Sequence, residues 1–286
     1  MPRGRAATHE TNGGSPAAPS TPKLELVDVR KRFSRRGAVV TALDGITLAV
    51  PAGQFCVVLG PSGCGKSTLL HIAAGLEPAS GGEIRIDGRS AGGPGPHRCM
   101  VFQSFALFPS MTVLRNVEFG LRVAKVGAAE RRRVAEEQLE RVGLTGFADA
   151  YPHELSGGMQ QRVAIARALV LEPELLLMDE PFGALDAQTR VTMQEEVVRL
   201  VARSSITTLF VTHSVEEAIY LGDRVIVMTA RPGRIKESID VPQHSAWREL
   251  PAHDAMSHPD FMALHQHIWA SVREEITSGP GGPETP

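Results

Sequence analysis

The region between residues 55 and 228 alternates short apolar runs with segments of helical spacing. The runs Phe55–Leu59, Leu175–Met178, Thr207–Val211 and Arg224–Met228 are mostly apolar. They are too short for ordinary helices, and they lack the polar alternation of a strand with one face in water. Segments with helical spacing lie between them, at about Gly158–Val170, Ala187–Arg203 and Val215–Leu221. Buried strands that alternate with helices predict an α/β fold with a mostly parallel sheet covered on both faces.

Two further patterns precede and interrupt this core. Alternating apolar and polar residues predict an antiparallel β layer and one more short strand, at Leu24–Val29, Val39–Val50, Glu83–Gly88 and Cys99–Gln103. From Thr112 to Val142 the spacing is helical and the segment is rich in charge. This change of period predicts a helical subdomain inserted into the sheet domain at about 104–165.

The segment after Pro259 predicts one amphipathic helix. Apolar residues occur there at helical spacing, with Trp269 beside them: Phe261, Leu264, Ile268, Val272 and Ile276. We expect this stripe to pack on the body of the protein. The ends of the chain, 1–22 and 277–286, are rich in Gly, Pro and small residues and predict flexible tails. The chain is thus divided into a main domain at 23–241 and a C-terminal extension at 242–276.

Composition narrows the class of protein. The 286 residues, 42% of them hydrophobic, suffice for one large α/β domain and a small appendage. The 30 basic and 32 acidic residues give a net charge of −2, without the basic surplus typical of nucleic-acid binding. No apolar stretch reaches the ~20 residues that span a bilayer, and no apolar segment follows Arg3 and Arg5 as in a secretory signal. We expect a cytosolic protein whose three cysteines are free thiols.

A glycine-rich run follows the first apolar strand and precedes a helix. It has the G-x-x-x-x-G-K-[ST] pattern and consists of Gly60, Pro61, Ser62, Gly63, Cys64, Gly65, Lys66, Ser67 and Thr68. Glycines let consecutive backbone N–H groups surround a phosphate, and the helix N-terminus adds positive charge. We expect Lys66 to reach the β- and γ-phosphates of a nucleotide and the Ser67 hydroxyl to bind Mg²⁺. Cys64 lies inside this loop, where its position matters through the backbone and the thiol is simply tolerated. The alternative hypothesis is that bulky thiol reagents inhibit nucleotide binding through Cys64.

Two groups of polar residues accompany this loop. The second apolar strand ends in Asp179 and Glu180, which places two carboxylates at the edge of the sheet where α/β proteins bind ligands. We expect Asp179 to hold Mg²⁺ beside the glycine loop. Ser156 is typical of a helix N-cap, and Gly157 and Gly158 open the helix that follows. The N-terminus of such a helix can bind a phosphate.

These motifs, in this order over Leu24–Val241, resemble those of the ATP-binding subunits of ABC transporters. The run Leu155–Arg162 is similar to the signature of that family, with Met159 in place of the commoner Gln. In ABC proteins the signature of one subunit caps the ATP held in the glycine loop of the other. The resemblance therefore implies a P-loop NTPase fold and a head-to-tail homodimer that holds two ATP molecules, each with Mg²⁺.

The resemblance also implies roles for individual residues. Glu180 matches the catalytic glutamate, and His213 matches the switch histidine near the γ-phosphate. Gln103 matches the glutamine that binds Mg²⁺ and water and links them to the helical subdomain. Phe33 occupies the place of an aromatic residue that stacks on adenine, although an aromatic there could equally be a core residue. Gly183–Asp186 resembles the loop that crosses the dimer interface.

Resemblance within the family indicates an importer. The segments Thr212–Ala218 and Met228–Ile235, and the ending around His258–Trp269, resemble the branch that imports nitrate, sulfonate, taurine and bicarbonate. Phe105–Val113 lies where relatives receive the coupling helix of the permease, with Ser110 in place of a common Trp. The implied partners are a second ATPase subunit, two permease subunits and, indirectly, a solute-binding protein. The implied location is peripheral, on the cytoplasmic face of the bacterial membrane.

Two other functions and a metal site are less consistent with the sequence. Soluble ABC ATPases of DNA repair or translation usually carry tandem cassettes, coiled coils or zinc modules, which this sequence does not suggest. A non-catalytic nucleotide-binding regulator would not need both Glu180 and His213. A metal site is not expected because His265 and His267, two apart on the predicted helix, point in different directions. The histidines considered for it are His244, His253, His258, His265 and His267.

Overall fold

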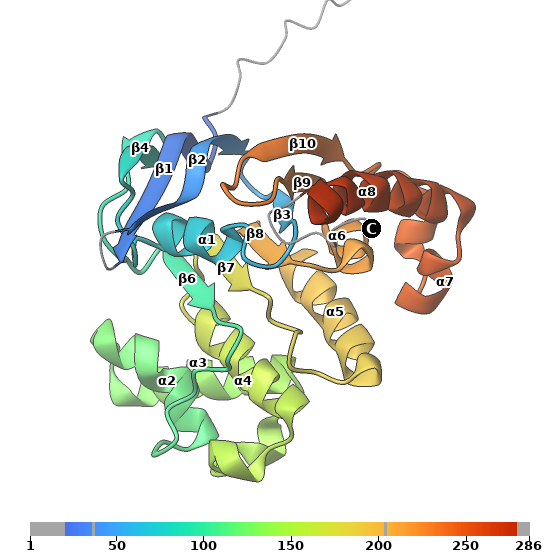
Figure 1. Ribbon diagram of the computed structural model, residues 1–286. Helices are drawn as coiled ribbons and strands as arrows, with labels where there is room; N and C mark the ends of the chain where they lie inside the picture. Colours follow the sequence, from blue (N-terminus) through green and yellow to red (C-terminus); the bar gives the residue numbers. More distant parts are fainter. Residues whose placement is uncertain (1–20, 36–37, 203–204, 279–286) are drawn as a thin grey trace, which may run out of the picture.

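The computed structural model describes residues 21–35, 38–202 and 205–278, whose strands form two sheets (Figure 1). The smaller sheet has the order β2-β1-β4-β5 and consists of β1 (Leu24–Arg35), β2 (Ala38–Val50), β4 (Gly81–Ile86) and β5 (Arg89–Ser90). The larger has the order β10-β9-β3-β8-β7-β6. It consists of β3 (Phe55–Leu59), β6 (Arg98–Val101), β7 (Leu175–Asp179), β8 (Thr207–Thr212), β9 (Arg224–Met228) and β10 (Ile235–Asp240).

The larger sheet is parallel except at one edge. Strands β6, β7, β8, β3 and β9 pair in parallel, and β10 pairs antiparallel with β9. The smaller sheet is antiparallel throughout. The predicted α/β fold, with a mostly parallel core and an antiparallel layer, is confirmed.

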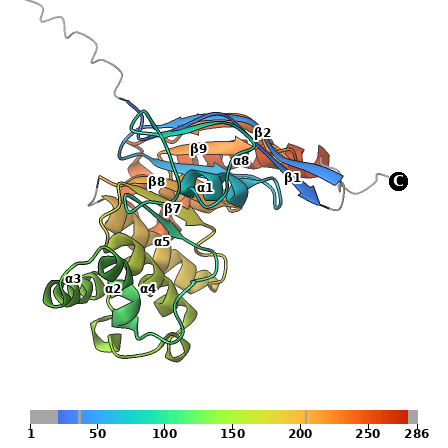
Figure 2. The same cartoon turned by 90° about the vertical axis from the view of Figure 1, so that its left-hand side faces the viewer.

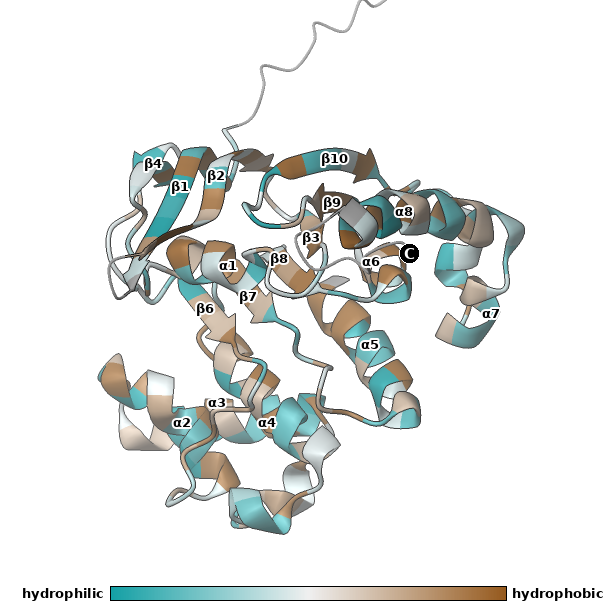
Figure 3. Ribbon diagram, in the orientation of Figure 1, coloured by the Kyte–Doolittle hydropathy of each residue, from teal (hydrophilic) through white to brown (hydrophobic). Residues whose placement is uncertain are grey.

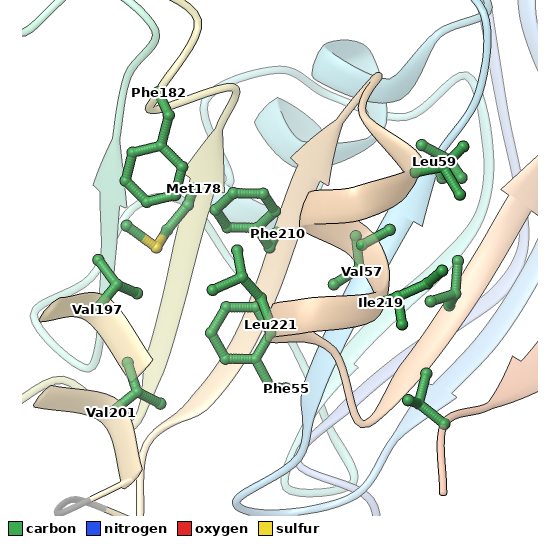
Figure 4. Close-up of a cluster of buried hydrophobic side chains, with 14 of the residues drawn as sticks. Phe55, Val57, Leu59, Met178, Phe182, Val197, Val201, Phe210, Ile219 and Leu221 are labelled. Atoms are coloured by element: carbon green, nitrogen blue, oxygen red, sulfur yellow. The ribbon is translucent and has the colours of Figure 1, made fainter. Parts of the chain in front are cut away.

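Alternate residues of the central strands enter two different hydrophobic cores. The core drawn in Figure 4 includes Phe55, Val57, Leu59, Met178 and Phe210. The other core includes Cys56 and Val58 of β3, together with α1 (Lys66–Ala74) and the antiparallel sheet. Both faces of β3 are therefore buried, which explains why it is apolar at every position. Strand β9 is hydrophobic along most of its length for the same reason (Figure 3).

A helical layer lies below the sheets and encloses a core of its own (Figures 1 and 2). It contains α2 (Val113–Val123), α3 (Ala128–Arg141) and α4 (Gly157–Leu169). The Thr112 side chain caps α2 by accepting a hydrogen bond from the Arg115 N–H. The helical segment predicted from Thr112 to Val142 is two helices, because the chain turns between them through Lys125 in the left-handed region (φ 61°).

The C-terminal extension packs on the helices beside the larger sheet. These helices are α5 (Ala187–Ala202) and α6 (Val215–Leu221), and the extension adds α7 (Ala252–Met256) and α8 (Pro259–Ser278). Phe261, Ile268 and Val272 of α8 are buried and Leu264 is partly buried, which confirms most of the predicted apolar stripe. Its last member, Ile276, is 49% exposed, so the packed face ends before that residue.

Some elements differ from the sequence-based prediction. Strand β10 and helix α7 were not predicted. Thr277 and Ser278, which the sequence assigns to a flexible tail, belong to α8, and the Thr277 hydroxyl donates to the Arg273 carbonyl (3.1 Å). The rest of the two predicted tails lies mostly outside the described residues. None of the described helices is both long enough and apolar enough to cross a membrane.

Candidate nucleotide site

The glycine-rich loop joins β3 to α1 and is shaped by glycines in the left-handed region. Gly63 has φ 75° and Gly65 has φ 109°. A Cβ atom on Gly65 would lie 2.8 Å from Leu43 Cδ2 and 2.9 Å from the Ala42 carbonyl oxygen. The loop thus passes so close to β2 that only glycine fits at this position.

Lys66 is buried at the first position of α1. Its side chain is 4% exposed, and Nζ donates to the carbonyl oxygens of Gly60 (2.9 Å) and Pro61 (3.1 Å). The same nitrogen lies 3.7 Å from Glu180 Oε1. The loop therefore fixes the ammonium group between its own backbone and a carboxylate from the end of β7.

The next residue of α1 meets the other acidic residue of β7. Ser67 Oγ donates to Asp179 Oδ1 (2.9 Å), and His71 Nε2 lies 3.9 Å from Asp179 Oδ2. Burial raises the pKa of the Asp179 carboxyl, while the hydrogen bond from Ser67 and the nearby His71 oppose that rise. A cation beside Asp179 would compensate the lost solvation and favour its ionised form.

Glu180 is the point at which the predicted catalytic residues meet. Its Oε2 lies 3.1 Å from His213 Nδ1 and 3.4 Å from Gln103 Nε2, and its Oε1 faces Lys66. Glu180 has φ 40°, and its backbone N–H donates to the Val211 carbonyl at the end of β8 (3.0 Å). Residues that follow β6, β7 and β8 thus converge on one carboxylate, because parallel strands end at the same edge of a sheet.

A cavity of about 330 Å³ opens beside this cluster, within the usual size range of ligand pockets. Its lining includes these residues predicted to bind nucleotide: Phe33, Ser62, Gly63, Gly65, Lys66, Ser67, Thr68 and Glu180. Val40, Ala42 and Arg231 also line it, and the sequence did not predict them. Phe33 is 40% exposed at the cavity, so it is not a core residue.

The predicted signature residues lie on a different element of the same chain. Ser156 caps α4 by accepting a hydrogen bond from the Met159 N–H (3.3 Å), and both Ser156 and Gly157 are exposed. A Cβ on Gly158 would lie 2.6 Å from Thr189 Cγ2, so α4 starts close against α5. None of the three lines the cavity, and α4 lies in the helical layer below α1 (Figure 1). One chain therefore presents two features predicted to bind phosphate at separate places.

Comparison with known proteins decides the family. The profile of the ABC transporter family matches residues 43–183. The chain is 44% identical to the nitrate import ATP-binding protein NrtD of Synechocystis sp., over 89% of this chain and 96% of that protein. The chain belongs to the ABC transporter family. It is also 47% identical to the taurine import ATP-binding protein TauB of Rhizobium johnstonii, over 83% of this chain and 91% of that protein.

Solved structures of ABC cassettes agree with this assignment. An ATP-binding cassette solved as a dimer in a post-hydrolysis state, with ADP and Pi bound, superposes with a TM-score of 0.69 at 34% identity. The match covers 77% of this chain and 99% of the cassette. The resemblance inferred from the motifs is confirmed, and the chain is the ATPase component of an ABC system.

In this ABC ATPase the burial of Cys64 favours a residue that is tolerated in the loop over a thiol that reagents can reach. Its side chain is 1% exposed and packs in the core shared by α1 and the antiparallel sheet. Burial raises the pKa of the thiol, and the charge of Lys66 only partly opposes the rise. The residue contributes to the loop through its backbone, and its thiol faces away from any reagent in solution.

We therefore expect the three cysteines to resist labelling in the folded protein. Burial raises the pKa of Cys56 to about 12 and that of Cys99 to about 11, so at pH 8 almost none of either thiol is ionised. Mass spectrometry after timed exposure to a disulfide reagent should find unmodified native protein and full modification in denaturant. Rapid labelling of native Cys64 would contradict the structure.

Proposed function

We propose that this chain binds and hydrolyses MgATP as the ATPase subunit of an importer, at a site built around Glu180. The observation that carries the proposal is the convergence of Lys66, His213 and Gln103 on the Glu180 carboxylate. ATP hydrolysis requires charge neutralisation and a positioned water more than covalent chemistry. The buried Lys66 ammonium provides the charge neutralisation. The Glu180 carboxylate, oriented by His213 and Gln103, provides the group that positions the water.

The residues of this cluster have distinct proposed roles. Glu180 orients and polarises the attacking water, and His213 and Gln103 hold its carboxylate in place from two sides. Lys66 exchanges the Gly60 and Pro61 carbonyl oxygens for phosphate oxygens when nucleotide binds. Phe33, which lines the same cavity, offers its ring to adenine.

The residues that would hold Mg²⁺ suit that ion. Ser67 and Asp179 present a hydroxyl and a carboxylate oxygen 2.9 Å apart, and Mg²⁺ prefers oxygen ligands and keeps several waters. Gln103 would add its amide oxygen from the end of β6. Bound there, Mg²⁺ would neutralise charge on the β- and γ-phosphates.

The site is proposed to be completed by a second copy of the chain. Ser156, Gly157 and Gly158 are exposed or half-exposed at the start of α4, away from the cavity of their own chain. A helix N-terminus with exposed N–H groups attracts phosphate. Together with the dimeric cassette structure reported above, this supports a head-to-tail homodimer in which each α4 caps the partner's ATP.

The proposed permease contact lies in the segment Phe105–Val113. Arg167 of α4 fixes this segment by donating to the carbonyl oxygens of Ala106 (2.7 Å) and Phe105 (3.3 Å). The Arg167 guanidinium also lies over the Phe108 ring, 5.5 Å from its centroid. Because Arg167 belongs to the helix that the signature begins, a force on this segment would reach the dimer interface directly.

The proposed importer takes up nitrate, a sulfonate, taurine or a similar small solute, and its similarity to a nitrate and a taurine import protein supports this range. The proposed catalytic unit is 23–241, with the helical subdomain at 104–165 and the extension at 242–276. The complex would include two permease subunits and a solute-binding protein, with this chain on the cytoplasmic face of the membrane.

The experiment that tests this function measures phosphate release by the full chain, alone and with its permease in lipid vesicles. We expect release that needs both ATP and Mg²⁺, co-purification with the permease, and stimulation by a binding protein loaded with its solute. Steady hydrolysis without any membrane partner would favour a soluble ABC ATPase. ATP binding without phosphate release in either setting would favour a nucleotide-binding regulator.

A further inference from the structure

The segment Thr229–Arg234, between β9 and β10, lies directly against the glycine loop. Gly233 N–H donates to the Ala42 carbonyl (2.9 Å), and the Gly233 carbonyl accepts from the Asp44 N–H (3.0 Å). A Cβ atom on Gly233 would lie 2.2 Å from the Cys64 carbonyl oxygen. Only glycine permits this approach, so the backbone of the segment touches the backbone of the phosphate loop.

Arg231 extends from this segment onto the loop. Its Nη2 and Nε both donate to the Gly63 carbonyl oxygen, at 3.0 and 3.3 Å. Gly63 has φ 75°, so this carbonyl belongs to a loop residue in the left-handed region. Arg231 also lines the nucleotide cavity, and it is the second cationic residue there in addition to Lys66.

The segment is itself held in place by α8. Ala230 N–H donates to Glu275 Oε2 (3.0 Å), and Lys236 Nζ lies 3.0 Å from Glu275 Oε1. Partial burial opposes ionisation of Glu275, but the Ala230 N–H and Lys236 lower the pKa of this carboxyl overall. Thr229 closes the segment by donating to the Pro232 carbonyl (3.0 Å) and accepting from the Arg234 N–H (2.9 Å).

Two hydrogen bonds, joined by the covalent backbone between Ala230 and Arg231, connect the C-terminal helix to the phosphate loop. One joins Glu275 to the Ala230 N–H, and the other joins Arg231 to the Gly63 carbonyl. Phosphate binding requires the N–H groups of the loop to point inward, and a carbonyl fixed from outside helps to hold that orientation. A positive group at the rim also attracts the nucleotide phosphates.

We propose that Arg231 is a positioning residue for ATP, which fixes the glycine loop at Gly63 and is itself held in place by Glu275 of α8. The inference rests on the proposed ATPase function, which it deepens. It gives the C-terminal extension a role in nucleotide affinity and accounts for the segment Met228–Ile235, which the catalytic cluster leaves unexplained.

The test compares nucleotide binding and steady-state kinetics of full-length variants. Arg231→Ala should weaken ATP and ADP binding and raise KM by about three- to tenfold, while kcat stays within about twofold of the parent. Arg231→Lys keeps the charge but not the forked geometry of the guanidinium. Its affinity and KM should therefore lie between those of the parent and those of Arg231→Ala. Calorimetric titration gives the affinity, and phosphate release gives KM and kcat.

The same segment offers a matched control. Arg234 pairs with Asp44 and does not line the cavity, so Arg234→Ala removes an arginine from the same segment without touching the nucleotide site. Likewise, Glu275→Ala should raise KM, whereas Glu274→Ala should not, because Glu274 binds only Lys236 among the contacts described for this segment.

Three outcomes are possible. If the parent binds and hydrolyses ATP and only the Arg231 and Glu275 variants raise KM, the proposal holds. If Arg231→Ala leaves affinity and KM unchanged, or if Arg234→Ala raises them equally, Arg231 has no positioning role. If the parent itself does not bind ATP, the proposed ATPase function fails instead, and the two failures are thereby distinguished.

Discussion

Replacing Glu180 with glutamine is expected to slow ATP hydrolysis by about 10²–10³-fold while ATP binding persists. Glutamine keeps the size of the side chain but removes the charge that polarises the water and pairs with Lys66 and His213. The Lys66 ammonium, freed of its nearby carboxylate, should bind the γ-phosphate at least as well. We therefore also expect the variant to favour the closed, ATP-bound dimer.

Single-turnover and steady-state phosphate release would measure the effect, with calorimetric titration of ATP alongside. Glu83→Gln is a suitable control, because Glu83 is a half-buried carboxylate on β4 that pairs with Arg85 outside the cavity. It should behave like the parent protein. Hydrolysis by Glu180→Gln at a rate near that of the parent would remove Glu180 from the catalytic role.

Replacing Lys66 with alanine is expected to weaken ATP binding by about 100-fold or more. The ammonium would bond to more than one phosphate oxygen, and each charged hydrogen bond contributes about 1.5–3 kcal/mol. The change also leaves the Gly60 and Pro61 carbonyls without their donor and Glu180 without its buried cation. The loss should therefore appear in affinity as well as in rate.

The matched control for Lys66 is Lys23. The Lys23 side chain is 14% exposed and pairs with Asp87 and Glu174. None of these three residues lines the cavity. Lys23→Ala should bind ATP normally even if its melting temperature falls. An ATP affinity of Lys66→Ala equal to that of the parent would show that the ammonium does not contact the nucleotide.

Residues of the catalytic cluster could be predicted because each belongs to a short motif at the end of a strand. Asp179, Glu180 and the glycine loop follow apolar runs, and parallel strands necessarily bring their C-terminal ends together. The sequence could not predict that His213, Gln103 and Lys66 would all lie around the Glu180 carboxylate. That detail depends on the turn at Glu180, with φ 40°.

Arg231 shows why other parts of the site could not be predicted. It lies 168 residues from Gly63 in the chain, and the contact depends on the path of a loop between β9 and β10. Cys64 illustrates a related limit, since its place in the motif was evident but the direction of its side chain was not. Among the described strands, β10 lies at the edge of its sheet and pairs with β9 alone. It is half-buried, so its apolar pattern is too weak to identify from sequence.

The central claim is that ATP is held between two copies of this chain. The most direct test is the mass in solution of Glu180→Gln, whose chain weighs close to the parent's 30.7 kDa, with and without ATP. We predict a monomer without nucleotide and twice that mass with ATP, and a return to monomer when Ser156→Arg is added although ATP is still bound. A monomer that holds ATP in Glu180→Gln, or a dimer indifferent to Ser156→Arg, would contradict the account.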